Sequence, residues 1–180
     1  PLVPIGDMLL FSDYDFCLNI GGFANVSFDH LDERIAYDIC PANIVLNHFT
    51  RLEGFDYDDK GRMASNGNVD AALLNKLNAL AFYDQQQPKS LGYEFVADVI
   101  LPIFADFDLS LEDTLRTFIE HCAIQISDNI NEASVNFDKE ELQVLITGGG
   151  ALNDFMIERI KDHTNALIVI PTKEIIEFKE

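Results

Sequence analysis

The sequence predicts an α/β fold: a mixed five-stranded sheet with helices on both faces. Three observations support this. Three short apolar segments separated by turn residues come first, between positions 14 and 39. After them, segments with helical spacing alternate with further strand-like runs. Finally, 48% of the 180 residues are hydrophobic, enough to bury the core of one large domain or two small ones.

The expected strands fall into two groups. Residues 14–20, 24–28 and 34–39 are short apolar runs that end at turn residues, which is typical of strands joined by hairpins. "LQVLIT" (142–147) and "ALIVI" (166–170) are continuous apolar runs of strand length, which favours buried strands.

Helices are expected wherever apolar residues recur at helical spacing. Pro41 suits a first helical turn and Ser110 opens a capping-box pattern, whereas Pro102 should kink or end its helix. The predicted helices cover 41–53, 69–83, 93–104, 110–133, 153–163 and 173–180, and polar loops are expected at 55–68 and 84–92.

The resulting order, β-β-β-α(αα)α-β-α-β-α, is the ribonuclease-H-like arrangement, two copies of which make the actin-like ATPases and sugar kinases. Only one such half is expected here. The chain begins without Met and ends inside a helical pattern, so we expect a piece of a longer protein. We assign residues 1–180 to a C-terminal lobe with a helical insertion at about 69–133, the other lobe lying upstream.

Charge and cysteine usage restrict the function classes. With 12 Lys+Arg against 31 Asp+Glu, the formal net charge is −19, which repels nucleic acid and anionic membranes, so neither is an expected partner. No apolar run approaches the ~20 residues of a membrane span. Cys17, Cys40 and Cys122 are scattered, which indicates reduced thiols in a cytoplasm, and the histidines show no zinc spacing.

"ITGGGALND" (146–154) places three glycines between a predicted strand and a predicted helix. A P-loop pattern is absent, and a Rossmann fingerprint fails because Asn153 stands where its third glycine should be. Bare backbone lets a flat ligand approach closely. A tight turn is the structural alternative, but one glycine would serve it, so three favour a nucleotide site.

"LNIGGFANVS" (18–27) contains a second glycine pair, Gly21-Gly22. Glycines at a hairpin bend can aim successive N–H groups at an anion, although an ordinary hairpin is the better explanation of the pair on its own. Taken together with the later glycine run, it resembles the second phosphate loop of the actin-like superfamily.

Motifs along nearly the whole chain resemble one family, the anhydro-N-acetylmuramic acid kinases. The opening "PLVP" and "LNIGGFANVS" are similar to its central segment, and "ITGGGALN" resembles its adenosine loop. "YDICPAN" (37–43) resembles its Asp-Thr-Gly-Pro-Gly-Asn loop, "QQPKSLGYE" (86–94) its Pro-Lys-Ser-Thr-Gly-x-Glu segment, and the final "KE" the start of its Glu-Ala-Leu helix. Cys40 and Ala42 replace two family glycines, which adds side chains beside the expected ligand loop.

The resemblance implies a reaction and its participants. Such enzymes bind ATP with Mg²⁺ between two lobes, open the 1,6-anhydro ring of the sugar with water, and phosphorylate the 6-oxygen during peptidoglycan recycling and amino-sugar catabolism. The resemblance places the activating Asp and the first phosphate loop upstream of Pro1. No catalytic residue and no metal ligand are therefore expected in this chain, which should be inactive alone.

The resemblance also implies site residues. The nucleotide-binding set is Gly21, Gly22, Asn25, Gly148, Gly149, Gly150 and Asn153, and the substrate-binding set is Asp38, Asn43, Lys89 and Glu180. Asn153 is an equally good helix N-cap, and Asp38 could simply cap a strand end. Glu120 and His121 lie in a long amphipathic helix and are expected to be structural. "FDYDDKG" (55–61) misses the calcium-loop spacing and is expected to be a solvated loop.

One alternative of a different class stays open: an actin-like module that uses nucleotide as a switch or for assembly, without sugar chemistry. The segment "QQPKSLGYE" argues against it, because filament proteins have no use for a sugar-kinase loop. A homodimer is left open by the sequence.

Overall fold

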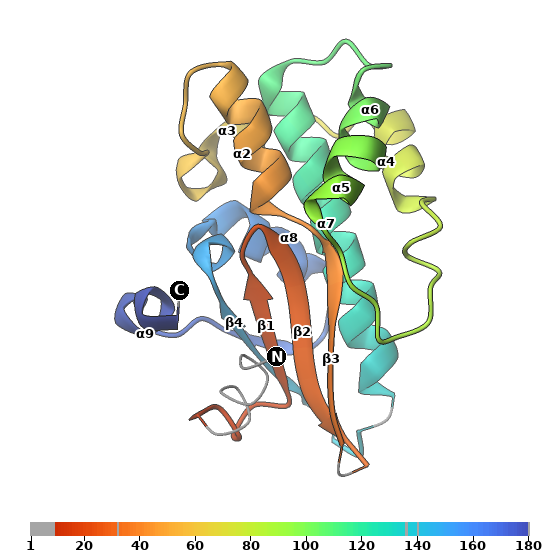
Figure 1. Ribbon diagram of the computed structural model, residues 1–180. Coiled ribbons are helices and arrows are strands. Elements are labelled where there is room, and N and C mark those ends of the chain that lie inside the picture. Colours follow the sequence, from red (N-terminus) through yellow and green to blue (C-terminus); the bar gives the residue numbers. More distant parts are fainter. Residues whose placement is uncertain (1–9, 32, 136, 140, 180) are drawn as a thin grey trace.

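The computed structural model describes residues 10–31, 33–135, 137–139 and 141–179, so the predicted substrate-binding residue Glu180 lies outside the described residues. Five strands form one sheet in the order β3-β2-β1-β4-β5 (Figure 1). Their bounds are β1 (Phe16–Ile20), β2 (Phe23–His30), β3 (Glu33–Pro41), β4 (Gln143–Thr147) and β5 (Leu167–Val169).

The sheet is mixed, as the sequence predicts. β2 pairs antiparallel with both β1 and β3, whereas β4 is parallel to β1 and to β5. The ends of β1, β3, β4 and β5 and the start of β2 therefore share one edge of the sheet. This edge carries both glycine segments, Gly21-Gly22 after β1 and Gly148–Gly150 after β4, so the prediction that they lie together is confirmed.

The main core lies between the sheet and two helices behind it in Figure 1, α7 (Leu111–Ser134) and α8 (Asp154–His163). Phe16, Leu18 and Ile20 alternate along β1 on the same face and are fully buried. Ser110 caps α7 by accepting a hydrogen bond from the Asp113 N–H (3.1 Å), as its sequence pattern predicts. Among the described helices, none is long and apolar enough to cross a membrane.

The predicted helical insertion, at about residues 69–133, contains fewer helical residues than expected. α4 (Ala71–Asn78) ends five residues before the expected end at 83, and the chain continues in tight turns in which the Leu80 N–H bonds to the Leu77 carbonyl (3.4 Å) and the Tyr83 N–H to the Leu80 carbonyl (3.0 Å). α5 (Tyr93–Phe95), a π-helical turn (Val96–Ile100) and α6 (Leu101–Phe104) then follow without a break. The wide turn directly precedes Pro102, which lacks the N–H of a regular helical bond.

Residues 55–68 are not the plain loop predicted. After α2 (Asn43–Leu52), they hold a 3₁₀ turn (Asp59–Gly61) and α3 (Arg62–Ser65). The Asp58 carboxylate, which is buried, accepts hydrogen bonds from the N–H groups of Met63 (2.9 Å) and Ala64 (3.0 Å). These bonds fix the first turn of α3. The last helix is α9 (Lys173–Lys179).

Candidate functional site

The β1–β2 hairpin and the start of α2 are joined by backbone hydrogen bonds. The Gly22 carbonyl accepts from the N–H of Ala42 (2.8 Å) and Ile44 (3.2 Å), and the Gly21 carbonyl accepts from the N–H of Asn43 (3.2 Å). The Asn43 side chain also donates to the Ile20 carbonyl (3.3 Å). The hairpin thus satisfies the first N–H groups of α2, which explains why this helix has no side-chain cap.

The fold itself does not require glycine at Gly21 or Gly22. Neither residue has the left-handed backbone that favours glycine. A Cβ on Gly21 would meet described atoms no nearer than 3.6 Å, and one on Gly22 no nearer than 3.7 Å, which is ordinary contact. The Gly21 N–H donates to the Phe23 carbonyl (3.1 Å), whereas the Gly22 N–H makes no hydrogen bond within the described chain. Gly22 therefore offers the available donor for an anion.

Two glycines of the later run, in contrast, are required by packing on β1. Gly148 has φ of 83°, and a Cβ there would lie 2.6 Å from Asn19 Oδ1 and 2.7 Å from the Ile20 carbonyl oxygen. A Cβ on Gly150 would collide with the Ile20 side chain. The argument that one glycine would serve the turn was wrong, because the turn packs directly against a neighbouring strand.

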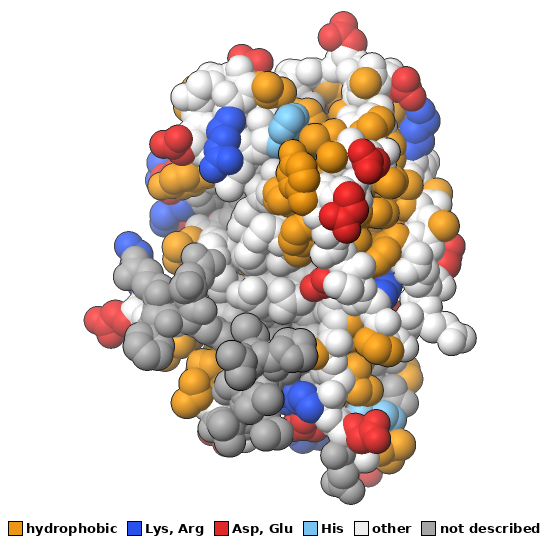
Figure 2. All heavy atoms as spheres, in the orientation of Figure 1, with side chains coloured by type: hydrophobic (Ala, Val, Ile, Leu, Met, Phe, Trp, Pro, Cys, Tyr) orange, Lys and Arg blue, Asp and Glu red, His pale blue; other side chains and the backbone are white. Residues whose placement is uncertain are grey.

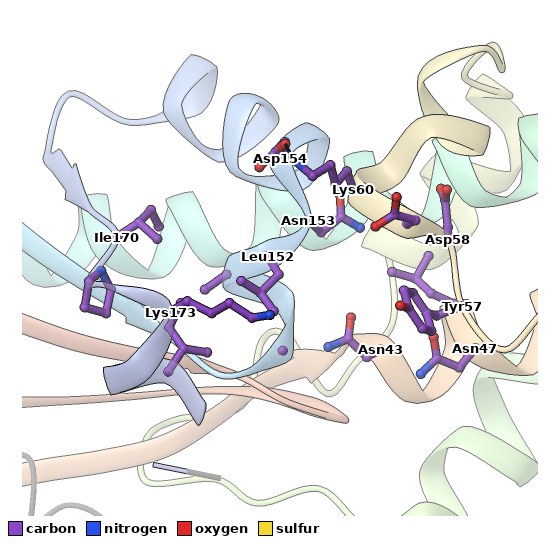
Figure 3. A pocket seen from close by; sticks show the side chains of 16 residues that line it. Asn43, Asn47, Tyr57, Asp58, Lys60, Leu152, Asn153, Asp154, Ile170 and Lys173 are labelled. Atoms are coloured by element: carbon purple, nitrogen blue, oxygen red, sulfur yellow. Dashed lines mark ion pairs between the residues drawn. The ribbon is translucent and has the colours of Figure 1, made fainter. Parts of the chain in front are cut away.

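A cavity of about 640 Å³ opens beside this edge (Figure 3). Its walls come from α2, the 57–60 segment, the turn before α8, and the end of β5 with the start of α9. It brings together three of the predicted site residues, Asn43, Gly149 and Asn153. The other lining residues are Leu46, Asn47, Tyr57, Asp58, Asp59, Lys60, Ala151, Leu152, Asp154, Ile170, Pro171, Lys173 and Ile176.

Asn153 has the N-cap role that the sequence allowed. Its Oδ1 accepts a hydrogen bond from the Met156 N–H (3.0 Å) at the start of α8. Because the cap uses the oxygen, the amide NH₂ is the part of this side chain that a ligand in the cavity can meet. The cap role and a ligand contact are therefore compatible at this position.

Asp38 and Lys89 form a second group, which does not line this cavity. The Asp38 carboxylate accepts hydrogen bonds from the Leu91 N–H (2.8 Å) and the Ser90 hydroxyl (3.2 Å). The Asp38 N–H donates to the Lys89 carbonyl (3.0 Å). Asn25 lies opposite Asp38 in the β2–β3 ladder. These bonds hold the segment before α5 against β3.

The Lys89 ammonium is turned toward its own segment. Nζ donates to the carbonyls of Phe82 and Tyr83, both at 3.2 Å, and lies 4.7 Å from the centre of the Phe82 ring. Burial lowers the pKa of Lys89 from its ordinary value. The charge of Lys89 thus holds this segment together.

A buried polar network connects the same segment to α7. The Tyr83 hydroxyl lies 2.8 Å from His121 Nε2, and His121 Nδ1 lies 2.6 Å from Asn78 Oδ1. Asn78 Oδ1 also accepts from Gln125 Nε2 (3.2 Å), so His121 donates through Nδ1 and accepts the Tyr83 proton at Nε2. Burial lowers the pKa of His121 to about 3, which keeps the ring neutral. This arrangement supports the structural interpretation of His121.

Glu120, the neighbour of His121, ties α7 to α8. Its carboxylate accepts from Arg159 Nε (2.8 Å) and Nη2 (3.1 Å), from His163 Nε2 (2.7 Å) and from Arg116 Nη1 (3.0 Å). Burial raises the pKa of Glu120, but the bonds to Arg159 and His163 outweigh that effect and leave the pKa below its usual value. Glu120 is therefore a buried structural anion.

The side chains that replace two family glycines face the core. Cys40 and Ala42 are both fully buried, and the Cys122 thiol on α7 contacts Cys40 and donates to the Pro41 carbonyl (3.4 Å). The N-cap residue Ala42 has a negative φ of −136°, which any residue can adopt. These replacements therefore leave the hairpin edge free of added side chains. All three cysteines are buried, and none of them forms a disulfide.

The sequence interpretation missed the wall formed by residues 57–60. Lys60 Nζ pairs with Asp154 Oδ2 (3.2 Å) at the cavity rim, and a Cβ on Gly61 would collide with Asn153 Oδ1. Lys60 and Gly61 both adopt left-handed backbone. The Lys-Gly pair indicated a tight turn, but nothing in the sequence indicated that this turn packs on the start of α8.

Carboxylates suitable for a metal do not gather here. Within residues 10–31, 33–135, 137–139 and 141–179, no group of three or more His, Cys, Asp or Glu side chains could hold a metal ion. A metal at this edge would need further ligands, such as phosphate oxygens.

Solved structures of low identity share this fold. An activator of 2-hydroxyisocaproyl-CoA dehydratase from Clostridium difficile matches with a TM-score of 0.56 and 14% identity, covering 94% of this chain and 58% of that chain. A xylulose kinase from Rhodospirillum rubrum matches with a TM-score of 0.58 and 12% identity, covering 94% and 37%. The fold is therefore that of the actin-like ATPases and sugar kinases.

Two curated sequence relatives have the same name. The anhydro-N-acetylmuramic acid kinases of Vibrio parahaemolyticus and Pseudomonas savastanoi pv. phaseolicola are 33% and 34% identical to this chain, over 90% of its length. The chain spans about half of these relatives, 45% of each. A sequence model of the same family, described as anhydro-N-acetylmuramic acid kinase, matches residues 1–177. The chain belongs to the anhydro-N-acetylmuramic acid kinase family.

Proposed function

We propose that this chain is the C-terminal lobe of an ATP-dependent kinase that acts on 1,6-anhydro-N-acetylmuramic acid in the cytoplasm. The enzyme would open the anhydro ring with water and phosphorylate the 6-oxygen, in peptidoglycan recycling. Family membership supports this reaction. The observation that carries the nucleotide role is Gly22, whose bare Cα and unbonded N–H lie at the sheet edge without any packing reason for glycine.

The nucleotide would lie along this edge. Its phosphates would meet the Gly22 N–H, beside Asn43, and its nucleoside would enter the cavity lined by Gly149 and Asn153. Mg²⁺ bound with the phosphates would neutralise the charge that develops during transfer. The described chain would contribute backbone donors and cavity walls, without a metal cluster of its own.

The sugar would lie toward Asp38. This carboxylate is held by Ser90 and Leu91, and Asn25 lies across from it in the ladder, so the group is rigid before any ligand binds. Lys89 would act mainly by shaping this segment, because its ammonium is already bonded to two carbonyls. Glu180 completes the proposed substrate set.

The chain alone should not turn over the sugar. The water-activating Asp and the first phosphate loop would belong to the missing lobe, and one positioned base is worth typically ~100- to 10,000-fold in rate. Losing one wall also removes the closure that excludes water. A coupled assay of ADP release, with anhydro-sugar and Mg²⁺, would compare the 180-residue chain with the full-length protein. Turnover by the chain at a rate close to that of the full-length protein would contradict the proposal.

Thermal-shift measurements on the full-length protein separate the kinase from a nucleotide switch. The kinase predicts an increase in melting temperature with 1,6-anhydro-N-acetylmuramic acid as well as with ATP. A response to ATP without any response to the sugar would favour the actin-like switch.

A further inference from the structure

Tyr57 is exposed, and its ring contacts no other aromatic ring or cation among the described residues. Its exposed fraction is 61%, although it lines the cavity beside the sheet edge. It is the sole aromatic residue among the described residues that line this cavity. Tyr93 has nearly the same exposure, 62%, but it lies outside the cavity and provides a matched comparison.

The backbone that carries Tyr57 is fixed on its C-terminal side. The next residue, Asp58, is buried and bonded to the N–H groups of Met63 and Ala64. Lys60 then pairs with Asp154 on α8, and Gly61 packs against Asn153. The segment is thus attached at successive residues to α3 and to α8. A ring on such a segment is held in place before a ligand arrives, which lowers the entropy lost on binding.

The wall across the cavity presents an exposed apolar side chain, Leu152, together with Lys173. Figure 3 shows Tyr57 and Asn47 on one side, and Leu152 with Lys173 on the other. Leu152 is 42% exposed, which is high for a leucine that lines a cavity. Two exposed apolar side chains on facing walls suit a flat heteroaromatic ring, which stacks on the tyrosine and contacts the leucine with its other face.

The position of the β1–β2 hairpin determines which end of a bound nucleotide would lie near Tyr57. Asn43 contacts the hairpin at Gly21, whereas Asn47 stands one helical turn further along α2, beside Tyr57. If the phosphates lie at Gly22, the base lies at the Tyr57 end of the cavity. We propose that Tyr57 is the stacking platform for the nucleotide base, an inference that rests on the proposed nucleotide binding.

The test compares the binding of ATP and of its fragments to the wild type and to single-residue variants. Calorimetry would measure the Kd of the full-length protein for ATP, adenosine and tripolyphosphate, in the wild type and in Tyr57→Ala, Tyr57→Phe and Tyr93→Ala. Stacking of one base is worth about 1–3 kcal/mol, so Tyr57→Ala should weaken ATP and adenosine by roughly 5- to 150-fold. Tyr57→Phe should bind nearly as the wild type does, because the ring remains. Tyr93→Ala should leave every Kd unchanged.

Tripolyphosphate separates stacking from general damage to the fold. It has no base, so its affinity should be equal in the wild type and in Tyr57→Ala. Wild-type ATP binding that Tyr57→Ala leaves unchanged would overturn the stacking role while leaving the nucleotide proposal intact. Equal weakening of ATP and tripolyphosphate would overturn it as well. Absence of ATP binding in the wild type at millimolar ligand would overturn nucleotide binding by this chain, and the platform with it.

Discussion

Tyr83 donates its hydroxyl proton to His121 Nε2 across 2.8 Å, and in doing so joins the segment after α4 to the middle of α7. His121 is fully buried, and its other nitrogen donates to Asn78. Because both ring nitrogens are used in one tautomer, the network tolerates only the neutral imidazole. Tyr83 also offers its carbonyl to Lys89, whose own carbonyl bonds to Asp38. The histidine therefore supports the proposed sugar side from within the core.

The first prediction concerns acid stability. The pKa of His121 is about 3 in the folded chain, against an ordinary value of 6.5, so below pH 6.5 the unfolded chain takes up a proton that the folded chain excludes. This group therefore lowers the free energy of unfolding as pH falls from about 6.5 toward 3, by about 1.4 kcal/mol per unit. Urea unfolding at several pH values should show a weaker pH dependence for His121→Gln than for the wild type. Parallel curves would contradict a neutral buried ring.

The second prediction separates two glycines by stability. Gly148→Ala places a Cβ on left-handed backbone and against Asn19, so it should lower the free energy of unfolding by about 1–3 kcal/mol. Gly22→Ala meets only ordinary contacts and should change it by less than about 1 kcal/mol. Denaturant unfolding of both variants checks this. Equal losses would show that the hairpin needs its glycine for folding.

The third prediction concerns ATP affinity in the full-length protein. Gly22→Val and Gly149→Val should each weaken ATP binding, since each adds a side chain where the phosphates or the nucleoside would lie. We expect at least a tenfold increase in Kd, a loss of about 1.4 kcal/mol. Ala72→Val is the control, because Ala72 is exposed on α4 and lies outside the cavity. Unchanged ATP affinity in Gly149→Val would contradict its adenosine role.

The fourth prediction tests the anion between α7 and α8. Glu120→Gln removes the charge that Arg116, Arg159 and His163 contact, so the partly buried guanidinium group of Arg116 loses its counter-ion and Arg159 keeps only its ion pair with Asp162 among the described residues. The free energy of unfolding should fall by about 2–4 kcal/mol. Glu112→Gln, at an exposed position of the same helix, should have little effect. Thermal or urea unfolding at neutral pH measures both, and similar losses would show that the network adds nothing specific.

Periodicity was enough to predict the five strands, α7 and α8, because their apolar residues repeat along the chain and face one core. The interval between 55 and 68 could not be predicted, since its order depends on Asp58 reaching N–H groups five and six residues later. The end of α4 could not be predicted either, because no glycine or proline follows Asn78 until Pro88 to mark the end of a helix.

Candidate site residues could be recognised from the sequence where they belong to a motif. Those that tertiary packing alone brings to the cavity could not. The two glycine segments were recognised from the sequence, but the reason for Gly148 and Gly150 is Ile20, on another strand. Tyr57 and Lys60 lie in a polar stretch without periodicity, so only their contacts with α8 and the cavity identify them as a wall. Tertiary contacts of this kind leave no local pattern.

The backbone hydrogen bonds between the β1–β2 hairpin and α2 join them into one rigid unit. A displacement of Gly21 or Gly22 must carry α2 with it or break bonds to Ala42, Asn43 and Ile44. The helix spans ten residues, or about 15 Å, and passes the cavity at Asn43 and Asn47. Because α2 is one continuous helix, it fixes the distance between the hairpin and the Asn47 end of the cavity.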